Sequence, residues 1–274
     1  MYDFVYGDRK KILSNPKDYL LFVKRLLPRW ANGIPDTECL ALFELLETLR
    51  KKNKKKLNLV ETGSGASSLA MFLHCAINGG KMFSWDTNPS KGSFLRNVAS
   101  ESIGKSLGVD VNKIWTFIPY NSTDKNIGIS VLKELKTKAN FCFFDSLHTL
   151  DHILNELSMF LKIADKRFIL AFDDAYYNKK SVNYSYVNML RKKLKLKTIQ
   201  EPKTNFSNKY FYEIENYLKQ KKIKFKKIKT SYKKTYKKDI FFKYFMQDRK
   251  FMNKMGMEEK NQLKNRLEVF LIQQ

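Results

Sequence analysis

Five short apolar segments constrain the fold of this chain more than any other feature. They are residues 57–60, 82–85, 114–118, 141–144 and 168–172, and helical or loop-like stretches separate them. Because parallel neighbours need crossover connections, this alternation predicts an α/β fold: a mostly parallel twisted sheet with helices on both faces. Leucines at helical spacing also predict a helix over residues 36–56. Ligands of such sheets bind beyond the carboxyl ends of the strands.

A glycine-containing turn follows the first apolar segment. It spans residues 61–65, reads ETGSG, and leads into a predicted helix over residues 66–76. Glycines let the backbone approach a ligand, and the helix N-terminus offers polar N–H groups to it. The turn is not a dinucleotide fingerprint, because GxGxxG would need a third glycine where Ser68 stands. Asp86 ends the second segment, where a carboxylate can accept hydrogen bonds from two ribose hydroxyls.

This combination resembles the class I, Rossmann-like methyltransferases, which use S-adenosylmethionine. In that family an E/D-x-G-x-G turn holds the methionine part of the cofactor, and an acidic residue after the second strand holds the ribose. The resemblance implies cofactor contacts from Glu61, Gly63, Gly65, Ser67 and Asp86. It also implies adenine contacts after the third segment, from Asn121 and Ser122.

A second group of polar residues follows the fourth and fifth segments. Asp145 and His148 come after residues 141–144, and Asp173 and Asp174 come after residues 168–172. Three carboxylates at neighbouring strand ends can supply oxygen ligands to a hard cation such as Mg²⁺. The sequence therefore predicts a metal site formed by Asp145, Asp173 and Asp174.

The second group resembles the metal-dependent small-molecule O-methyltransferases of the catechol and caffeoyl-coenzyme A type, and those that methylate macrolide sugars. The resemblance covers roughly residues 34–177. It implies that Asp145, Asp173 and Asp174 bind the metal, and that His148, in a D-x-x-H pattern, acts as general base.

Structural explanations compete with these roles. One alternative is that Asp145 merely caps the next helix. Another is that the Asp173-Asp174 pair merely forms a turn. His148 and His152 have the i, i+4 spacing of a metal pair, but His152 faces away from the apolar stripe and is expected at the surface. His74 is expected to be packed or exposed rather than a ligand.

The chain is strongly basic, with 52 Lys and Arg against 27 Asp and Glu and a formal net charge of +25. Two explanations of this charge compete. One is the composition bias of an AT-rich genome, with lysine at solvated positions, and the other is a surface that binds polyanions. Eleven lysines fall within residues 219–238, together with Tyr232 and Tyr236. An RNA methyltransferase or RNA-binding protein would use that segment for phosphate contacts and stacking. The D/N-P-P-Y motif of amine methylators is absent, and specific nucleic-acid binding is not expected.

The remaining segments suggest how the domain is arranged. Helices are predicted around residues 186–197 and 211–218, strands over 223–228 and 240–245, and a terminal helix over 256–274. We expect an N-terminal extension (1–35), a methyltransferase domain (36–250) and a C-terminal helical tail (251–274). Three isolated cysteines and the lack of a signal-peptide or membrane-spanning pattern predict a cytoplasmic protein.

These patterns together predict an S-adenosylmethionine-dependent, metal-assisted O-methyltransferase that acts on a small hydroxylated acceptor. Sugar hydroxyls and vicinal diols are the acceptors that the resemblance favours. Two alternatives stay open: the RNA-directed function, and a binding module that keeps the cofactor pocket without chemistry. No membrane partner is expected, and a homo-oligomer remains possible.

Overall fold

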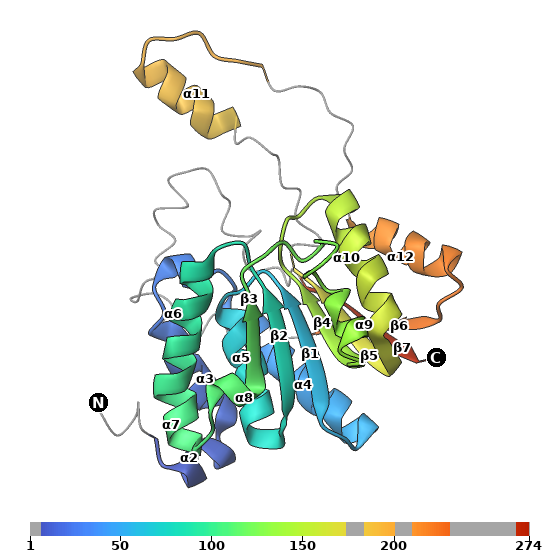
Figure 1. Cartoon of the computed structure of the whole chain (residues 1–274). Coiled ribbons are helices and arrows are strands. Elements are labelled where there is room, and N and C mark those ends of the chain that lie inside the picture. Colours follow the sequence, from blue (N-terminus) through green and yellow to red (C-terminus); the bar gives the residue numbers. More distant parts are fainter. Residues whose placement is uncertain (1–6, 174–183, 201–209, 231–266, 274) are drawn as a thin grey trace.

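A computed structural model describes residues 7–173, 184–200, 210–230 and 267–273 of the chain (Figure 1). Its centre is a seven-stranded sheet with the order β3-β2-β1-β4-β5-β7-β6. Strands β1 to β5 are parallel, and β7 runs antiparallel to both β5 and β6. The strands are β1 (Leu57–Thr62), β2 (Gly80–Trp85), β3 (Trp115–Ile118), β4 (Ala139–Phe144), β5 (Ala164–Phe172), β6 (Phe225–Lys227) and β7 (Glu268–Gln273). The α/β prediction is confirmed, and β3 to β5 follow the Rossmann order 3-2-1-4-5.

Helices cover both faces of this sheet (Figure 1). One face carries α2 (Arg9–Ser14), α3 (Pro16–Arg25), η1 (Arg29–Ala31), α4 (Asp36–Asn53), α5 (Ala66–Asn78), α6 (Pro89–Ala99), the π-helical turn η2 (Ser100–Gly104), α7 (Lys105–Leu107) and α8 (Val111–Ile114). The other face carries α9 (Val131–Glu134), α10 (Leu150–Ile163) and α12 (Tyr210–Gln220). Helix α11 (Tyr184–Lys193) lies between two segments outside the described residues.

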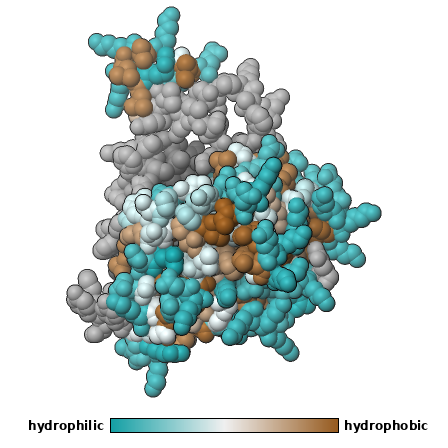
Figure 2. Space-filling model, in the orientation of Figure 1, coloured by the Kyte–Doolittle hydropathy of each residue, from teal (hydrophilic) through white to brown (hydrophobic). Residues whose placement is uncertain are grey.

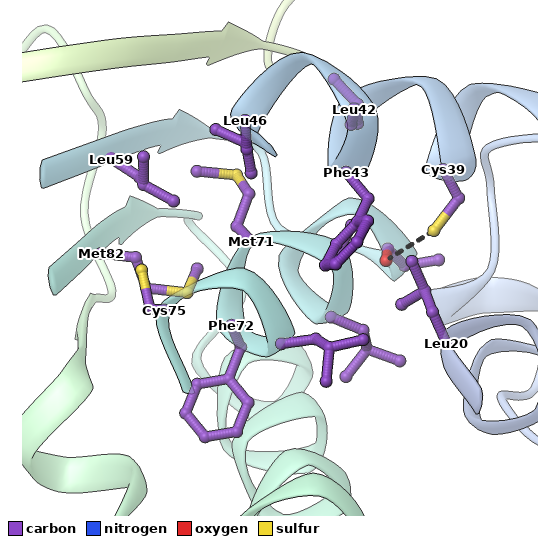
Figure 3. Packing of buried hydrophobic residues seen from close by; sticks show 14 of the residues in the cluster. Leu20, Cys39, Leu42, Phe43, Leu46, Leu59, Met71, Phe72, Cys75 and Met82 are labelled. Atoms are coloured by element: carbon purple, nitrogen blue, oxygen red, sulfur yellow. Dashed lines mark hydrogen bonds between the residues drawn. The ribbon is translucent and has the colours of Figure 1, made fainter. Parts of the chain in front are cut away.

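Residues 141–144 and 168–172 are unbroken apolar runs because successive residues enter two different cores. Leu59 and Phe143 pack under α4 and α5, whereas Val60 and Phe144 pack under α10. Figure 3 shows the first core, where Leu59 and Met82 of the strands meet Leu46 and Met71 of the helices. A strand buried on both faces needs no polar alternation, which is why the five segments were recognisable.

The N-terminal residues are part of this core. Leu20 and Val23 of α3 are buried in the first cluster, together with Leu27. The buried Lys24 ammonium lies 2.8 Å from the Asp36 carboxylate and so joins α3 to the start of α4. Of the segment expected to be an extension, α3 and its flanking residues therefore pack against the first core.

The predicted C-terminal helix is wrong where the structure describes it, since residues 268–273 form β7. Leu170 pairs with Phe270, and Phe168 pairs with Ile272. A short apolar run is compatible with a helix or with a strand buried on both faces. Here the run forms a strand because it pairs with the edge of β5. The predicted strand 240–245, residues 256–266 of the predicted helix and residues 231–238 of the lysine-rich segment lie outside the described residues.

The surface that surrounds these cores is mostly hydrophilic on the side seen in Figure 2. Apolar areas are visible near the middle of the main body and on α11 (Figure 2), and the exposed large hydrophobic side chains include Leu147, Met189 and Leu190. None of the described helices combines the length and the apolar content needed to cross a membrane.

Candidate active site

The order in which strands are added to the sheet reverses between β1 and β4, and the predicted site lies at the carboxyl ends of these two strands. The two strands are adjacent, although β2 and β3 lie between them in sequence. The Asp145 N–H donates to the Thr62 carbonyl at 2.8 Å, and the Asp173 N–H donates to the Phe144 carbonyl at 3.0 Å. The turns after β1, β4 and β5 therefore begin at the same level. In open α/β sheets such a switch point is where ligands bind.

Gly63 is the residue that allows the turn after β1 to contact the turn after β4. Its φ is +82°, and a Cβ placed there would lie 2.0 Å from the Asp145 carbonyl oxygen. Its N–H donates to the Trp85 carbonyl at 2.7 Å, so the same residue is bound to β2. Only glycine fits both the conformation and the contact.

The turn continues directly into the N-terminus of α5. Gly65 N–H donates to the Ser68 hydroxyl at 3.1 Å, and the Ser68 N–H donates back to the Gly65 carbonyl. The Ser64 hydroxyl oxygen is buried and has no hydrogen-bond partner among the described residues. A glycine turn with an unsatisfied hydroxyl at a helix N-terminus suits a polar ligand.

Glu61 lies beneath this turn and is fully buried. Its two carboxylate oxygens accept the hydroxyls of Ser67 and Ser68, each at 2.5 Å. Burial raises the pKa of Glu61 to about 8, against the opposing effect of the two hydroxyl hydrogen bonds. The structure thus places Glu61 and Ser67 under the glycine turn, where they hold the start of α5.

The raised pKa of Glu61 predicts how stability varies with pH. The folded state holds the Glu61 proton more tightly than the unfolded chain, whose glutamate titrates near 4.5. Its contribution to the unfolding free energy is therefore fully present below that value and is lost as pH rises to about 8.

We expect Glu61→Gln, which stays neutral, to flatten this part of the pH profile. Denaturant unfolding between pH 4.5 and 8 measures the effect in both proteins. An unchanged slope in the variant would show that Glu61 titrates normally.

Asp86 follows β2 and faces the glycine turn. Its carboxylate accepts the Ser64 N–H at 3.0 Å and the Asn88 N–H at 2.9 Å, and Lys91 of α6 lies 3.2 Å away. The side chain is 12% exposed, so a ligand at the turn can reach it. Lys91 was not singled out from the sequence, although it follows Asp86 by only five residues in the first turn of α6.

Asp145 and His148 lie together at the end of β4. The His148 Nε2 is 3.3 Å from the Asp145 Oδ1, and the side chains are 9% and 21% exposed, respectively. Asp145 also contacts Gly63 through its backbone. This places an imidazole with a carboxylate partner beside the glycine turn.

The described residues do not assemble the predicted magnesium ligands. Asp173 is buried at the end of β5, next to β4, and Asp174 lies outside the described residues. In the described part of the chain no three His, Cys, Asp or Glu side chains are grouped so that they could hold a metal ion. Asp145 is instead paired with His148.

The two residues expected near the adenine differ in their placement. Asn121 is exposed, and its side-chain Oδ1 accepts the N–H and the hydroxyl of Thr123. Ser122 is buried and donates its hydroxyl to Glu156 of α10. Both follow β3, but the described bonds of their side chains stay within the protein.

His152 is not the surface residue that was expected. Its side chain is 13% exposed, and its Nε2 lies 3.1 Å from the carboxylate of Glu156. Glu156 was not among the expected site residues, although an acidic residue within the apolar stripe of α10 was the available signal. His74, in contrast, is packed, with its Nδ1 2.8 Å from Glu47 of α4.

Comparison with known proteins gives one match in sequence and several in structure. A profile described as a methyltransferase domain matches residues 60–175. No curated protein matches the chain. The structure is similar to an O-methyltransferase from Bacillus cereus in complex with S-adenosylhomocysteine (SAH), with 11% identity and a TM-score of 0.49 over 94% of this chain and 90% of that one.

Two further solved structures are similar over smaller parts. CalS11, a TDP-rhamnose 3'-O-methyltransferase of calicheamicin biosynthesis, has 11% identity and a TM-score of 0.47 over 79% of this chain and 80% of that one. MycE, from the mycinamycin pathway, has 13% identity and a TM-score of 0.35 over 48% of this chain. The match spans only 33% of MycE. Similarities this remote do not identify what the chain acts on.

The matched residues contain the second half of β1 and all of β2 to β5, together with the glycine turn, Asp86 and Asp145. Residues 60–175 are therefore similar to a methyltransferase domain, and they lie in a sheet with the Rossmann-like strand order.

Proposed function

We propose that this protein transfers a methyl group from S-adenosylmethionine to a hydroxyl oxygen of a small acceptor in the cytoplasm. The pairing of Asp145 with His148 beside the glycine turn is the observation that carries this proposal. Sugar hydroxyls and vicinal diols are the acceptors we favour, on the resemblance to the small-molecule O-methyltransferases.

The residues around the glycine turn fit the cofactor. Gly63 and Gly65 would let its methionine part lie against the backbone, near the buried Ser64 hydroxyl. Asp86 would accept the ribose hydroxyls, and residues 121–122 would flank the adenine. When bound, the cofactor supplies an electrophilic methyl group on its sulfonium.

The acceptor must lose a proton as its oxygen forms the new bond, because a neutral hydroxyl is a poor nucleophile. His148 takes this proton, and the Asp145 carboxylate orients the imidazole and stabilises the cation that forms. Asp145 is fixed in turn by its backbone bond to β1. The base is thereby held at a set distance from the cofactor turn.

Magnesium assistance is proposed only in a form that includes Asp174, since the described residues do not complete a ligand set. If Asp174 joins Asp145 and Asp173 at an ion, we expect EDTA to abolish turnover and Mg²⁺ to restore it. Asp174→Asn should then need more Mg²⁺ while binding SAH normally. Full turnover in excess EDTA would contradict a role for the metal and would leave His148 as the group that assists the reaction.

Product formation tests the proposal as a whole. We expect S-adenosylmethionine to be converted to SAH in the presence of a hydroxylated acceptor, whose mass rises by one methylene. Methylation only at the nitrogen of amine acceptors would contradict O-methylation, and methylation of RNA in place of any small acceptor would contradict the proposed substrate class.

A further inference from the structure

We propose that Glu156 is a positioning residue of the methyl-transfer site, which fixes the turn after β3 relative to the turn after β4. The inference rests on the proposed function, because the first turn would flank the adenine and the second carries Asp145 and His148.

Glu156 is fully buried on α10, accepts hydrogen bonds from three hydroxyls and contacts a histidine ring nitrogen. The Thr62 hydroxyl, at the end of β1, donates to Oε2 at 3.2 Å. The Ser146 hydroxyl donates to Oε1 at 2.7 Å, and the Ser122 hydroxyl donates to the same oxygen. The Nε2 of His152, one helical turn before Glu156, lies 3.1 Å from that oxygen. One carboxylate thus joins four segments at the carboxyl end of the sheet.

Packing alone does not account for an acidic residue at this position. The other inward positions of α10, Ile153, Leu157 and Phe160, are apolar and belong to the second core. An isolated buried carboxylate is costly, and it persists only where several donors meet it. Two of the partners here, Ser122 and Ser146, lie in the turns that the cofactor and the acceptor would contact, whereas Thr62 ends β1 and His152 lies on α10.

The bonds of Glu156 act on the two turns separately. Ser122 is the residue that carries the constraint on the turn after β3, and its backbone carbonyl also accepts the Ile129 N–H at 2.8 Å. Ser146 follows Asp145 directly, so its bond to Glu156 fixes the residue next to the His148 partner. Loss of the first bond should loosen the cofactor side, and loss of the second should misplace the base.

Matched variants separate positioning from a general loss of stability. Glu156→Gln removes the charge at nearly constant size, and Ser122→Ala and Ser146→Ala each remove one bond. Glu47→Gln is the control, because Glu47 forms the corresponding glutamate–histidine pair with His74 between α4 and α5. SAH affinity is measured by titration calorimetry, the melting temperature without ligand, and turnover with the identified acceptor.

We expect the SAH dissociation constant to rise about tenfold or more in Glu156→Gln, the loss typical of hydrogen bonds to a charged group. Ser122→Ala should weaken SAH binding, while Ser146→Ala should keep it and lower turnover. Glu47→Gln should change only the melting temperature. If Glu156→Gln does not fold, the two serine variants decide the question.

Equal SAH affinity and turnover in wild type, Ser122→Ala and Ser146→Ala would overturn the positioning role. The positioning role would also be overturned if the loss of SAH affinity in every variant, including the control Glu47→Gln, simply followed the drop in melting temperature. If the wild-type protein itself does not bind SAH, the proposed function fails first, and the two failures are thus distinguishable.

Discussion

Replacing His148 with alanine should lower turnover by about 10² to 10⁴, the usual contribution of a positioned general base. The imidazole lies 3.3 Å from Asp145 and is the group we propose to receive the acceptor proton. Its removal leaves the glycine turn and Asp86 in place, so SAH affinity should stay within about twofold of wild type. Single-turnover assays at saturating S-adenosylmethionine measure the chemical step directly.

Asp145→Asn is the companion variant for this prediction. The amide preserves the size of the side chain but cannot stabilise an imidazolium as a carboxylate does. We expect a loss of turnover smaller than that of His148→Ala, and little further loss when both substitutions are combined. An unchanged rate in His148→Ala would remove the base from the mechanism.

Gly63→Ala should destabilise the fold by at least about 2 kcal/mol, because a left-handed conformation costs 1–2 kcal/mol for a residue with a Cβ and the contact adds to it. The new Cβ would lie 2.0 Å from the Asp145 carbonyl oxygen, which is backbone and cannot rotate away. The turn after β1 and the turn after β4 must then separate. We therefore expect SAH binding to be lost even where the protein remains folded.

Gly33→Ala provides the matched control. No heavy atom lies within 4 Å of the Cβ position at Gly33, and its φ is outside the left-handed range. This variant should unfold at the wild-type denaturant concentration and bind SAH normally. If Gly63→Ala behaves in the same way, the close approach of the two turns has no energetic importance.

The sheet was predictable from sequence to the extent that its strands are buried on both faces. Residues 141–144 are apolar without interruption because Phe143 and Phe144 enter different cores. Strand β7 was missed because its pairing with β5 joins residues about a hundred positions apart, such as Leu170 and Phe270. Local spacing carries no information on such a partner.

The same division between local and distant contacts applies to the site. The glycine turn and Asp86 occupy neighbouring strand ends that follow from the order of β1 and β2. The partner of Ser122 was not predictable, because Glu156 reaches it only after α10 is packed. Lys91, five residues after Asp86, is a local partner that the strand-end pattern did not single out. The exposure of His152 was misjudged for a different reason, because its i, i+4 pairing with Glu156 on the same helix is local and was overlooked.

Titration of the wild-type protein with SAH tests the central assignment most directly. A ligand that binds only the folded state at about 100 times its dissociation constant stabilises it by about 2.7 kcal/mol, which a melting curve detects as a clear upward shift. Asp86→Ala should abolish most of this shift, and Asp18→Ala, at an exposed position on α3, should keep it. The absence of any shift in the wild-type protein with millimolar SAH or S-adenosylmethionine would contradict the cofactor site, and with it the proposed methyl transfer.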